Sequence, residues 1–508
     1  MDRNPIYLMC NYLSLKHWIG TCAIGAAMLV LFNLSQAQHR QSAKANGIRA
    51  TVAQLEQSIP HLMHEGDIPG LAIALIRNGE IAWSRGFGVQ NTETKKVVND
   101  ETVFEAASLS KPVFAYAVLK LVDKGKLALD TPLTRYLPGK YDVGDDPHLN
   151  QITVRQILSH TSGFPNWRPR GESMLKIHFT PGDRFSYSGE GYVYLAKVVE
   201  HVTGEAFNAF MKRTVFEPLG MKSSSFVWQD SYEARKTFRH NAVGIVSGRN
   251  KPETANAAAS LQTTATDYAR FVIATIRSTG LKSETARLML TPQISVAEAG
   301  TNNINRPNPK LSPSISWGLG WGLQKNNNGI SFWHWGDNGD SKAYIVGSRE
   351  QKSAVIIFAN SSTGLTIINE LVEATLGGQQ PALAWLNYET YNSPARNLLK
   401  AILRSDAKTV LSDYRLRRQR GDQNARLTEA QVNRLGYQLL GLKRVNDAIE
   451  VFMQNTSDYP QSFNTWDSLA EAYMIKGDKE SAIKYYQKSL ELNPDNTNAI
   501  QKIKELES

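Results

Sequence analysis

The chain has 508 residues, enough for two to four domains at ~150 residues each, and 42% of its residues are hydrophobic while 20% are charged. This composition excludes a wholly disordered chain and a membrane protein with many spans. The net charge of +10 is local, because seven basic and only two acidic residues lie between Lys400 and Arg420. A solvated helix is favoured there over a membrane-surface or nucleic-acid contact, so we expect no nucleic-acid partner.

The first 37 residues have the pattern of an export signal. An uncharged stretch, residues 19–32, follows Arg3 and Lys16 and precedes Ser35-Gln36-Ala37, whose small residues suit a cleavage site. We expect a signal peptide over residues 1–37 and a periplasmic or extracellular location. The alternative is an uncleaved anchor, and only then would the protein contact a membrane. Fourteen apolar residues are fewer than the ~20 that span a bilayer.

Both cysteines, Cys10 and Cys22, lie within that segment. The mature chain would therefore contain no disulfide, no thiolate metal site and no cysteine nucleophile. Neither an HExxH motif nor a Walker loop occurs in the sequence. We expect no metal and no cofactor.

Two short hairpins mark the ends of one domain. After a helix expected over residues 49–65, the apolar run 71–76 meets Asn78-Gly79 and continues into residues 80–89. Asn-Gly between two apolar runs is the strongest short hairpin signal.

The second hairpin joins residues 342–347 to residues 354–359 through a polar turn, and a helical pattern follows over residues 365–376. Most of the chain between the two hairpins has the pattern of helices and loops. Strands at both ends of a helical middle predict an α+β domain over residues 48–380. In it, one antiparallel sheet is flanked by helices and carries a helical insert.

A 34-residue periodicity begins in the last fifth of the chain. Leu435, Ala448, Phe452 and Pro460 recur as Leu469, Ala482, Tyr486 and Pro494. The pattern resembles tetratricopeptide repeats, which implies an all-α domain over residues 427–508 and a protein partner bound by it. Because a stable stack needs about three repeats, the basic linker 381–426 is expected to serve as an irregular first unit or to dock on the upstream domain.

Ser108 and Lys111 are the strongest candidates for chemistry. Their segment runs directly into the apolar helix expected over residues 113–122. If the first turn of that helix includes them, Ser108 and Lys111 share one face and the amine can reach the hydroxyl. A serine hydroxyl is a poor nucleophile without a base, and a lysine becomes a base only when burial or another cation removes its proton. The alternative is a helix cap with a solvated lysine.

Seven residues with aromatic rings are further candidates for this site or its surroundings. Tyr187 lies in a glycine-rich loop before a helix, where its phenol can share the proton transfer, the alternative being a packing tyrosine. His160 is more simply interpreted as a structural histidine in a turn. Tryptophans could wall the site, although core packing is the default for most of them. They are Trp167, Trp317, Trp321, Trp333 and Trp335.

Several ordered segments carry a family resemblance. They are Ile68-Pro69-Gly70, the Ser108 motif, residues 152–163, Pro181-Gly182 leading to Tyr187-Ser188, residues 260–267, residues 317–322 and His334-Trp335-Gly336. Together they resemble the serine β-lactamase and penicillin-binding superfamily. The resembling branch contains class C β-lactamases, D-alanyl-D-alanine carboxypeptidases and related esterases.

The resemblance implies a role for each matching residue. Ser108 would be acylated, Lys111 and Tyr187 would exchange its proton, and the main-chain N–H groups of Ser108 and Asp337 would form the oxyanion hole. His334 would act from the third motif, on a strand edge at the site. Main-chain donors of this kind contribute roughly 3 to 4 kcal/mol each in acyl transfer.

Two departures concern substrate recognition, to which Ser188, Gly189, Trp335 and Gly336 would contribute as lining residues. Gly189 stands where the family motif Tyr-x-Asn has an asparagine, so the amide that would hold the substrate's acyl amide is missing. His334 stands where efficient β-lactamases have a lysine, so we expect carboxylate recognition to depend on pH. We also expect Gly189→Asn to increase acylation by lactams.

The sequence therefore predicts an exported serine hydrolase that forms an acyl-enzyme on an ester, amide or peptide substrate. Esters should react well above β-lactams. The alternative from another class is a non-catalytic sensor or scaffold, which binds a ligand in the same fold and recruits a partner through its repeats.

Overall fold

The computed structural model describes residues 50–139, 141–169, 172–327 and 329–507. The predicted signal peptide, with Cys10 and Cys22, lies outside these residues. In the ranges described, no helix is both long enough and apolar enough to cross a membrane.

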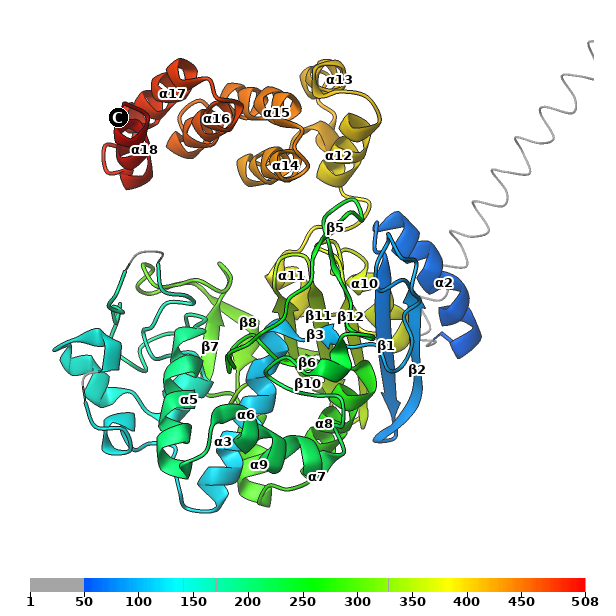
Figure 1. Ribbon diagram of the computed structural model, residues 1–508, viewed down its shortest axis with the longest axis vertical. Helices are drawn as coiled ribbons and strands as arrows, with labels where there is room; N and C mark the ends of the chain where they lie inside the picture. Colours follow the sequence, from blue (N-terminus) through cyan, green and yellow to red (C-terminus); the bar gives the residue numbers. More distant parts are fainter. Residues whose placement is uncertain (1–49, 140, 170–171, 328, 508) are drawn as a thin grey trace, which may run out of the picture.

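The N-terminal domain is built on an eight-stranded antiparallel sheet in the order β2-β1-β12-β11-β10-β9-β8-β7 (Figure 1). Its strands are β1 Gly70–Arg77, β2 Glu80–Gly88, β7 Ile294–Ala297, β8 Leu311–Trp317, β9 Gly322–Asn326, β10 Gly329–Asp337, β11 Lys342–Ser348 and β12 Ser353–Ala359. Both predicted hairpins occur, and Asn78 and Gly79 have the positive φ angles, 53° and 76°, that a tight hairpin turn requires. Strand β1 pairs with β12, so strands from the two ends of the domain lie side by side within the sheet, second and third in its order.

Both faces of the sheet are covered, which explains why its central strands are apolar throughout. Along β1, Leu71, Ile73 and Leu75 belong to one hydrophobic core, while Ala72 and Ala74 belong to the core on the other face. The first core is closed by helices α2 Val52–Glu65, α10 Ile368–Thr375 and α11 Pro381–Leu386.

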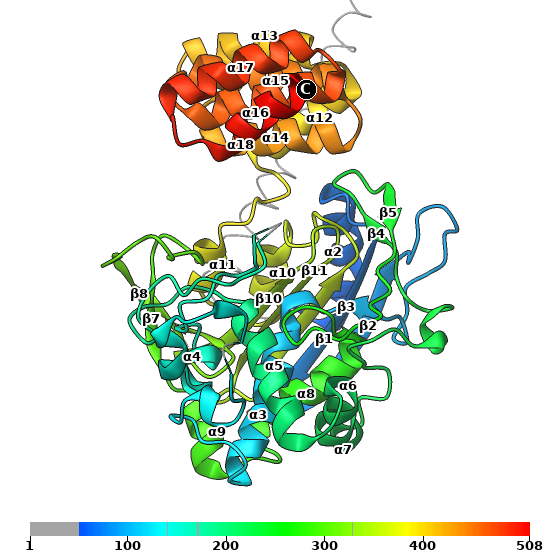
Figure 2. The same ribbon diagram turned by 60° about the vertical axis from the view of Figure 1, so that its left-hand side comes forward.

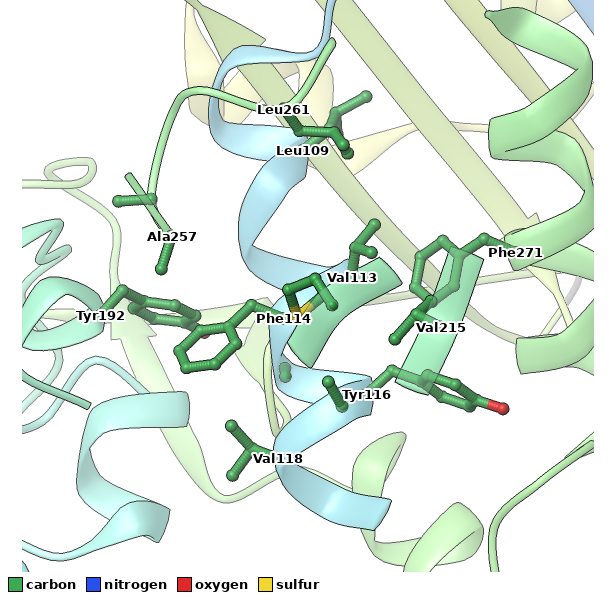
Figure 3. Packing of buried hydrophobic residues seen from close by; sticks show 14 of the residues in the cluster. Leu109, Val113, Phe114, Tyr116, Val118, Tyr192, Val215, Ala257, Leu261 and Phe271 are labelled. Atoms are coloured by element: carbon green, nitrogen blue, oxygen red, sulfur yellow. The ribbon is translucent and has the colours of Figure 1, made fainter. Parts of the chain in front are cut away.

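The opposite face carries the larger core, which is built around α3 Ser110–Asp123, α5 Glu190–Thr203 and α8 Ala265–Arg277. Helix α3 is buried on nearly all sides, and Figure 3 shows its Val113, Phe114 and Tyr116 among side chains from the neighbouring elements. The smaller elements of this domain are β3 Phe104–Glu105, α4 Val154–Leu158, α6 Phe207–Met211, α7 Glu217–Leu219, β4 Arg239–His240, β5 Val246–Gly248, β6 Gln262–Thr263 and α9 Ser283–Met289. Helices on a large antiparallel sheet confirm the predicted α+β class.

One half of the sheet differs from the sequence prediction. Apart from the strand expected at His334, residues 294–337 lie in the stretch whose pattern was mostly that of helices and loops, yet they contribute β7 to β10. Pro313 within β8 and the polar residues of β9 weaken the usual strand pattern. Serines alternating with Leu311, Ile315 and Trp317 are a period-two signal that could have predicted β8.

The C-terminal part is all helical and stacks as a separate layer in both views (Figures 1 and 2). Its helices are α12 Pro394–Arg404, α13 Ala407–Gln419, α14 Glu429–Gly441, α15 Val445–Asp458, α16 Phe463–Lys476, α17 Lys479–Leu492 and α18 Thr497–Glu507. One hydrophobic core runs from Leu399 of α12 to Leu469 of α16. The basic helices therefore form the first unit of the stack.

Helix α12 also docks on the N-terminal domain. Arg396 Nη2 donates hydrogen bonds of 2.6 Å to both Asp67 Oδ2 and the Ala242 carbonyl, and its side chain is only 1% exposed. Lys400 Nζ donates to the Glu65 carbonyl at 2.6 Å. Both roles expected for the basic linker are thus combined in one helix.

The segment before α12 packs with the sheet instead. Ala382 and Leu383 of α11 are buried in the N-terminal core, and Trp385 and Tyr391 lie against it. By packing, the N-terminal core therefore extends about ten residues past position 380, and the helical stack begins with α12.

Candidate active site

Ser108 lies on a sharp turn between β3 and α3. The turn is a single 3₁₀ turn, Ala107–Leu109, and Ala107 has a left-handed φ of 48°, which costs an alanine about 1 to 2 kcal/mol. Ser110 Oγ holds the turn by donating to the Ala107 carbonyl at 2.6 Å and accepting from Leu261 N at 3.0 Å. Ser108 itself stays partly exposed, so a substrate can reach its hydroxyl.

Lys111 is fully buried beside that hydroxyl. Its Nζ lies 3.1 Å from Ser108 Oγ and donates to the Ala258 carbonyl at 2.9 Å. Both contacts are with neutral oxygens, and burial lowers the pKa of Lys111 well below its usual range. A neutral amine here has a lone pair with which to accept the Ser108 proton, and the two residues meet as their spacing predicts.

Tyr187 covers the same amine. Its ring centroid lies 4.7 Å from Lys111 Nζ, and its side chain is only 5% exposed. Burial raises the pKa of the phenol, an effect that the neighbouring Ser108 hydroxyl partly offsets. Its oxygen makes no hydrogen bond of regular geometry with the described residues. Of the pair, Lys111 is therefore suited to accept a proton and Tyr187 to donate one.

His160 supports Tyr187 from behind. The two rings stack with centroids 4.2 Å apart, and His160 Nδ1 accepts the backbone N–H of Ser188 at 3.0 Å. Burial, with Lys111 nearby, lowers the pKa of His160 well below its usual range. A neutral, buried imidazole agrees with the structural role expected from the sequence.

His334 has a different charge state from the one expected. Its ring is fully buried and its Nδ1 donates to the Trp335 carbonyl at 2.8 Å. Burial, followed by the influence of Lys111, lowers the pKa of His334 to about 3. The expectation of a pH-dependent cation for a carboxylate is therefore wrong, because burial keeps the ring neutral from mildly acidic to alkaline pH.

Gly336 brings strand β10 against the Ser108 turn. A Cβ at this position would lie 2.4 Å from the Ala106 carbonyl and 3.2 Å from the Ala107 methyl, so only glycine allows this approach. The next residue, Asp337, is thereby placed beside the turn. The contribution of the Asp337 N–H to an oxyanion hole stays a prediction.

The other predicted lining residues are mostly enclosed. Ser188 Oγ donates to the Pro165 carbonyl at 2.9 Å and accepts from Gly191 N at 3.0 Å, so its hydrogen bonds hold a loop together. Trp335 packs on Tyr187 with centroids 4.8 Å apart and is nearly buried. Direct contact of Ser188 or Trp335 with a substrate stays a prediction.

Gly189 has no room for a side chain. A Cβ there would lie 2.7 Å from the Asn166 carbonyl and 2.8 Å from the nearest carbon of the Trp167 ring. The main-chain carbonyl cannot move aside as a flexible side chain would. This steric conflict argues against the expected gain of lactam acylation in Gly189→Asn, since the new side chain would displace the loop that contains Asn166 and Trp167.

The sequence analysis missed Tyr388. This tyrosine lies beyond α11, and its hydroxyl donates to Asp337 Oδ2 at 2.7 Å, while Lys342 pairs with the other oxygen of that carboxylate. Tyr388 thus anchors the residue whose N–H is expected in the oxyanion hole. No local pattern marks Tyr388, because the contact joins segments about 50 residues apart.

Comparisons with known proteins agree with this architecture. The beta-lactamase family model matches residues 55–374, and a tetratricopeptide-repeat model matches residues 463–496. Protein flp of Staphylococcus aureus (strain NCTC 8325 / PS 47) is 23% identical over 329 residues, which cover 60% of this chain and 62% of that protein. Esterase EstB of Burkholderia gladioli is 31% identical over 205 residues, 34% of this chain and 51% of that protein. The chain thus spans less than two thirds of these curated relatives.

Solved structures show the same fold. The octameric penicillin-binding protein homologue from Pyrococcus abyssi superposes with a TM-score of 0.55 at 24% identity, covering 69% of this chain and 81% of that one. The D-alanine carboxypeptidase AmpC from Burkholderia cenocepacia gives 0.52 at 20% identity, covering 63% and 96%. With a family model spanning more than half of its length, the chain belongs to the beta-lactamase and penicillin-binding family and carries a C-terminal tetratricopeptide repeat.

Proposed function

We propose that the protein is an exported serine hydrolase that forms an acyl-enzyme on Ser108 and acts on ester, amide or peptide substrates. The observation that carries this proposal is the partly exposed Ser108 hydroxyl, 3.1 Å from the amine of a lysine that is buried without a carboxylate among its hydrogen-bond partners. Burial of Lys111 supplies the base that a serine nucleophile needs. Export rests on the sequence of residues 1–37 alone.

The reaction follows from these positions. Lys111 Nζ accepts the Ser108 proton while Oγ attacks the substrate carbonyl, and the oxyanion that forms lies against the N–H groups of Ser108 and Asp337. As the tetrahedral intermediate collapses, the bond to the leaving group breaks and the leaving group takes a proton from the Lys111 and Tyr187 pair. A water molecule then attacks the acyl carbonyl, gives its proton to the same pair, and releases the acid and free Ser108.

Esters are the favoured substrates within that range. Gly189 provides no amide for an acyl amide, and the neutral His334 provides no positive charge for a carboxylate. An activated ester needs neither contact to acylate a serine. Two similar proteins, an esterase and a D-alanine carboxypeptidase, are named for reactions of the same kind.

Covalent labelling tests the proposal. A fluorophosphonate should add to Ser108 in the mature protein, as located by mass spectrometry of its peptides, and Ser108→Ala should abolish both the adduct and ester turnover without lowering the melting temperature. Ser405→Ala is the control and should keep the adduct, because Ser405 also stands three residues before a lysine but is exposed and lies in the helical stack. A panel of p-nitrophenyl esters, a D-alanyl-D-alanine peptide and a chromogenic cephalosporin ranks the substrates, with esters expected first.

An unlabelled, inactive wild-type protein would contradict the proposal. That result would favour a non-catalytic sensor or scaffold that recruits a protein through its repeats. A label on another serine would overturn the assignment of Ser108. Efficient turnover of the cephalosporin would show that the missing amide and the neutral His334 do not limit recognition.

A further inference from the structure

The loop formed by residues 165–168 occupies the place that a side chain at position 189 would fill. Its Asn166 accepts the Gly189 N–H through both the carbonyl, at 2.9 Å, and Oδ1, at 3.1 Å. Arg168 N donates to Glu190 Oε1 at 3.0 Å, on the first turn of α5. Together with the bond from Ser188 to Pro165, these contacts fix the loop to the segment that carries Tyr187.

Trp167, at the centre of this loop, is placed unlike the tryptophans of the core. Trp317, Trp321 and Trp333 are fully buried, whereas Trp167 is 43% exposed. Its ring centroid nevertheless lies 5.9 Å from Lys111 Nζ, next to the amine that faces Ser108. An indole held beside the nucleophile and open to solvent offers a flat apolar surface to whatever is bound there.

We propose that Trp167 determines the specificity of the site by packing its indole face against the acyl group attached to Ser108. The preferred substrates are then esters of acids with a flat aromatic group, for example arylacetic acids. The inference rests on the proposed function and narrows it. At position 189 an aromatic contact from the loop replaces the hydrogen bond that an asparagine side chain would make.

The direction of the contact follows from where the loop lies. Trp167 packs on Gly189, which stands at the motif position whose side chain would hold the acyl part of a substrate. Strand β10 approaches the Ser108 turn at other atoms, since Gly336 lies against the Ala106 carbonyl and the Ala107 methyl. A larger acyl group should therefore meet the indole, while the alcohol of the ester leaves without contacting it.

Two ester series with the full mature chain separate these sides. The first keeps p-nitrophenol as leaving group and compares acetyl with phenylacetyl esters, and the second keeps the acetyl group and compares phenyl with naphthyl esters. We expect kcat/KM to favour phenylacetyl over acetyl by roughly 10-fold. Trp167→Ala should remove that preference, Trp167→Phe should keep most of it, and neither should alter the ratio in the second series.

Phe463→Ala is a matched control, because Phe463 is also an exposed aromatic residue but lies in α16 of the helical stack. It should change neither ratio. An unchanged acyl preference in Trp167→Ala would overturn the proposal. A change confined to the leaving-group series would overturn it too, since the indole would then contact the alcohol.

A binding measurement distinguishes this proposal from the proposed hydrolysis. Calorimetry with the Ser108→Ala chain should show phenylacetate binding roughly 10-fold tighter than cyclohexanecarboxylate or acetate, with the difference lost when Trp167→Ala is added. Suppose that phenylacetate binds more tightly and that this depends on Trp167, while Ser108 of the wild-type protein takes no label. That result would support the aromatic site and refute the proposed acylation of Ser108. Equal binding of the three acids would refute the aromatic site alone.

Discussion

Two buried lysines near the Ser108 turn differ in one neighbour. Lys111 and Lys236 both have fully buried side chains, yet Lys111 contacts a hydroxyl and a carbonyl, whereas Lys236 Nζ lies 3.6 Å from Glu105 Oε1. Burial lowers the pKa of Lys236, but Glu105 limits the fall and leaves it at about 8. The pKa of Lys111 falls well below its usual range. Equal burial therefore gives a base in one place and a cation in the other.

The pKa of Glu105, like that of Lys236, is set by its charged neighbours as well as by burial. Burial alone would raise the pKa of Glu105, but Lys236 and Arg239 hold it at about 2. Arg239 donates to both oxygens, at 2.7 and 2.5 Å, and Asn338 Nδ2 lies 3.2 Å from one of them. Glu105 lies three residues before Ser108, and Asn338 directly follows Asp337. This ion-pair cluster thus joins the two segments expected to form the oxyanion hole.

Replacing Lys111, the lysine without a carboxylate neighbour, should have the largest effect on activity. We expect Lys111→Met to reduce the rate of acylation roughly 100- to 10,000-fold, because the base is lost. It should also stabilise the protein at neutral pH. Between the lowered folded pKa and the unfolded value of ~10.4, the unfolded wild-type chain binds more protons, so its stability rises with pH by up to about 1.4 kcal/mol per unit.

Urea unfolding at pH 7 and pH 9, together with labelling rates, checks this prediction. The stability advantage of Lys111→Met should shrink at the higher pH. Lys124→Met, at the exposed end of the same helix, is the control and should show no such change. An advantage that does not depend on pH would mean that Lys111 is charged in the folded protein.

Removing the carboxylate of Glu105 should make the surroundings of Lys236 similar to those of Lys111. Glu105→Gln leaves the buried Lys236 and the partly buried Arg239 without their counter-charge, and we expect a loss of roughly 3 to 5 kcal/mol of unfolding free energy. Adding Lys236→Met should restore part of it. Urea unfolding measures both, with Glu101→Gln on the exposed turn nearby as control. A double variant no more stable than Glu105→Gln would show that the two charges are not coupled.

Two truncations sharpen the comparison between the catalytic region and the helical stack. A chain that ends at residue 392 loses Arg396 and its bonds to Asp67 and Ala242, so we expect a melting temperature lower by several degrees with activity on a small ester retained. A chain that ends at residue 380 also loses Tyr388 and its bond to Asp337, so activity should fall as well. Equal activity of the two chains would show that Tyr388 does not support the site.

The smallest effect concerns His334. Because its pKa is held at about 3, this histidine should not contribute to the dependence of kcat/KM on pH above about 5. We expect activity to fall on acidification as Lys111 takes up its proton, with the same midpoint in the wild type and in His334→Asn. A shift of that midpoint in His334→Asn, measured with a neutral ester, would show that the ring titrates with the reaction.

The sequence predicted those features that depend on neighbours along the chain. Asn78-Gly79 marked a hairpin, and the spacing of Ser108 and Lys111 placed the amine beside the hydroxyl. It did not show that β7 to β10 together complete the sheet: Pro313 interrupts the alternation in β8, and polar residues interrupt the apolar pattern of β9. Backbone pairing with neighbouring strands decides that structure.

The sequence also could not show the charge state of His334 or the lack of space for a side chain at Gly189. The pKa of His334 depends on burial by elements from distant parts of the chain, which no local pattern reports. The exclusion of a side chain at Gly189 depends on a loop more than twenty residues away, around Asn166. The motifs indicated which residues lie together around Ser108, and tertiary packing decides the charge and the free space at each of these positions.

The pairing of β1 with β12 has a consequence for how the chain folds. Leu71 stands opposite Ala359 in the sheet, so the β1–β2 hairpin is finished long before its partner strand exists. At ribosomal rates of about 5 to 20 residues per second, the apolar edge of β1 waits roughly 15 to 60 s for β12. Closing so long a loop is slow, and an unpaired apolar edge invites aggregation. A chain in which β12 is not yet in place is therefore more prone to aggregate than the finished domain, in which β12 covers that edge.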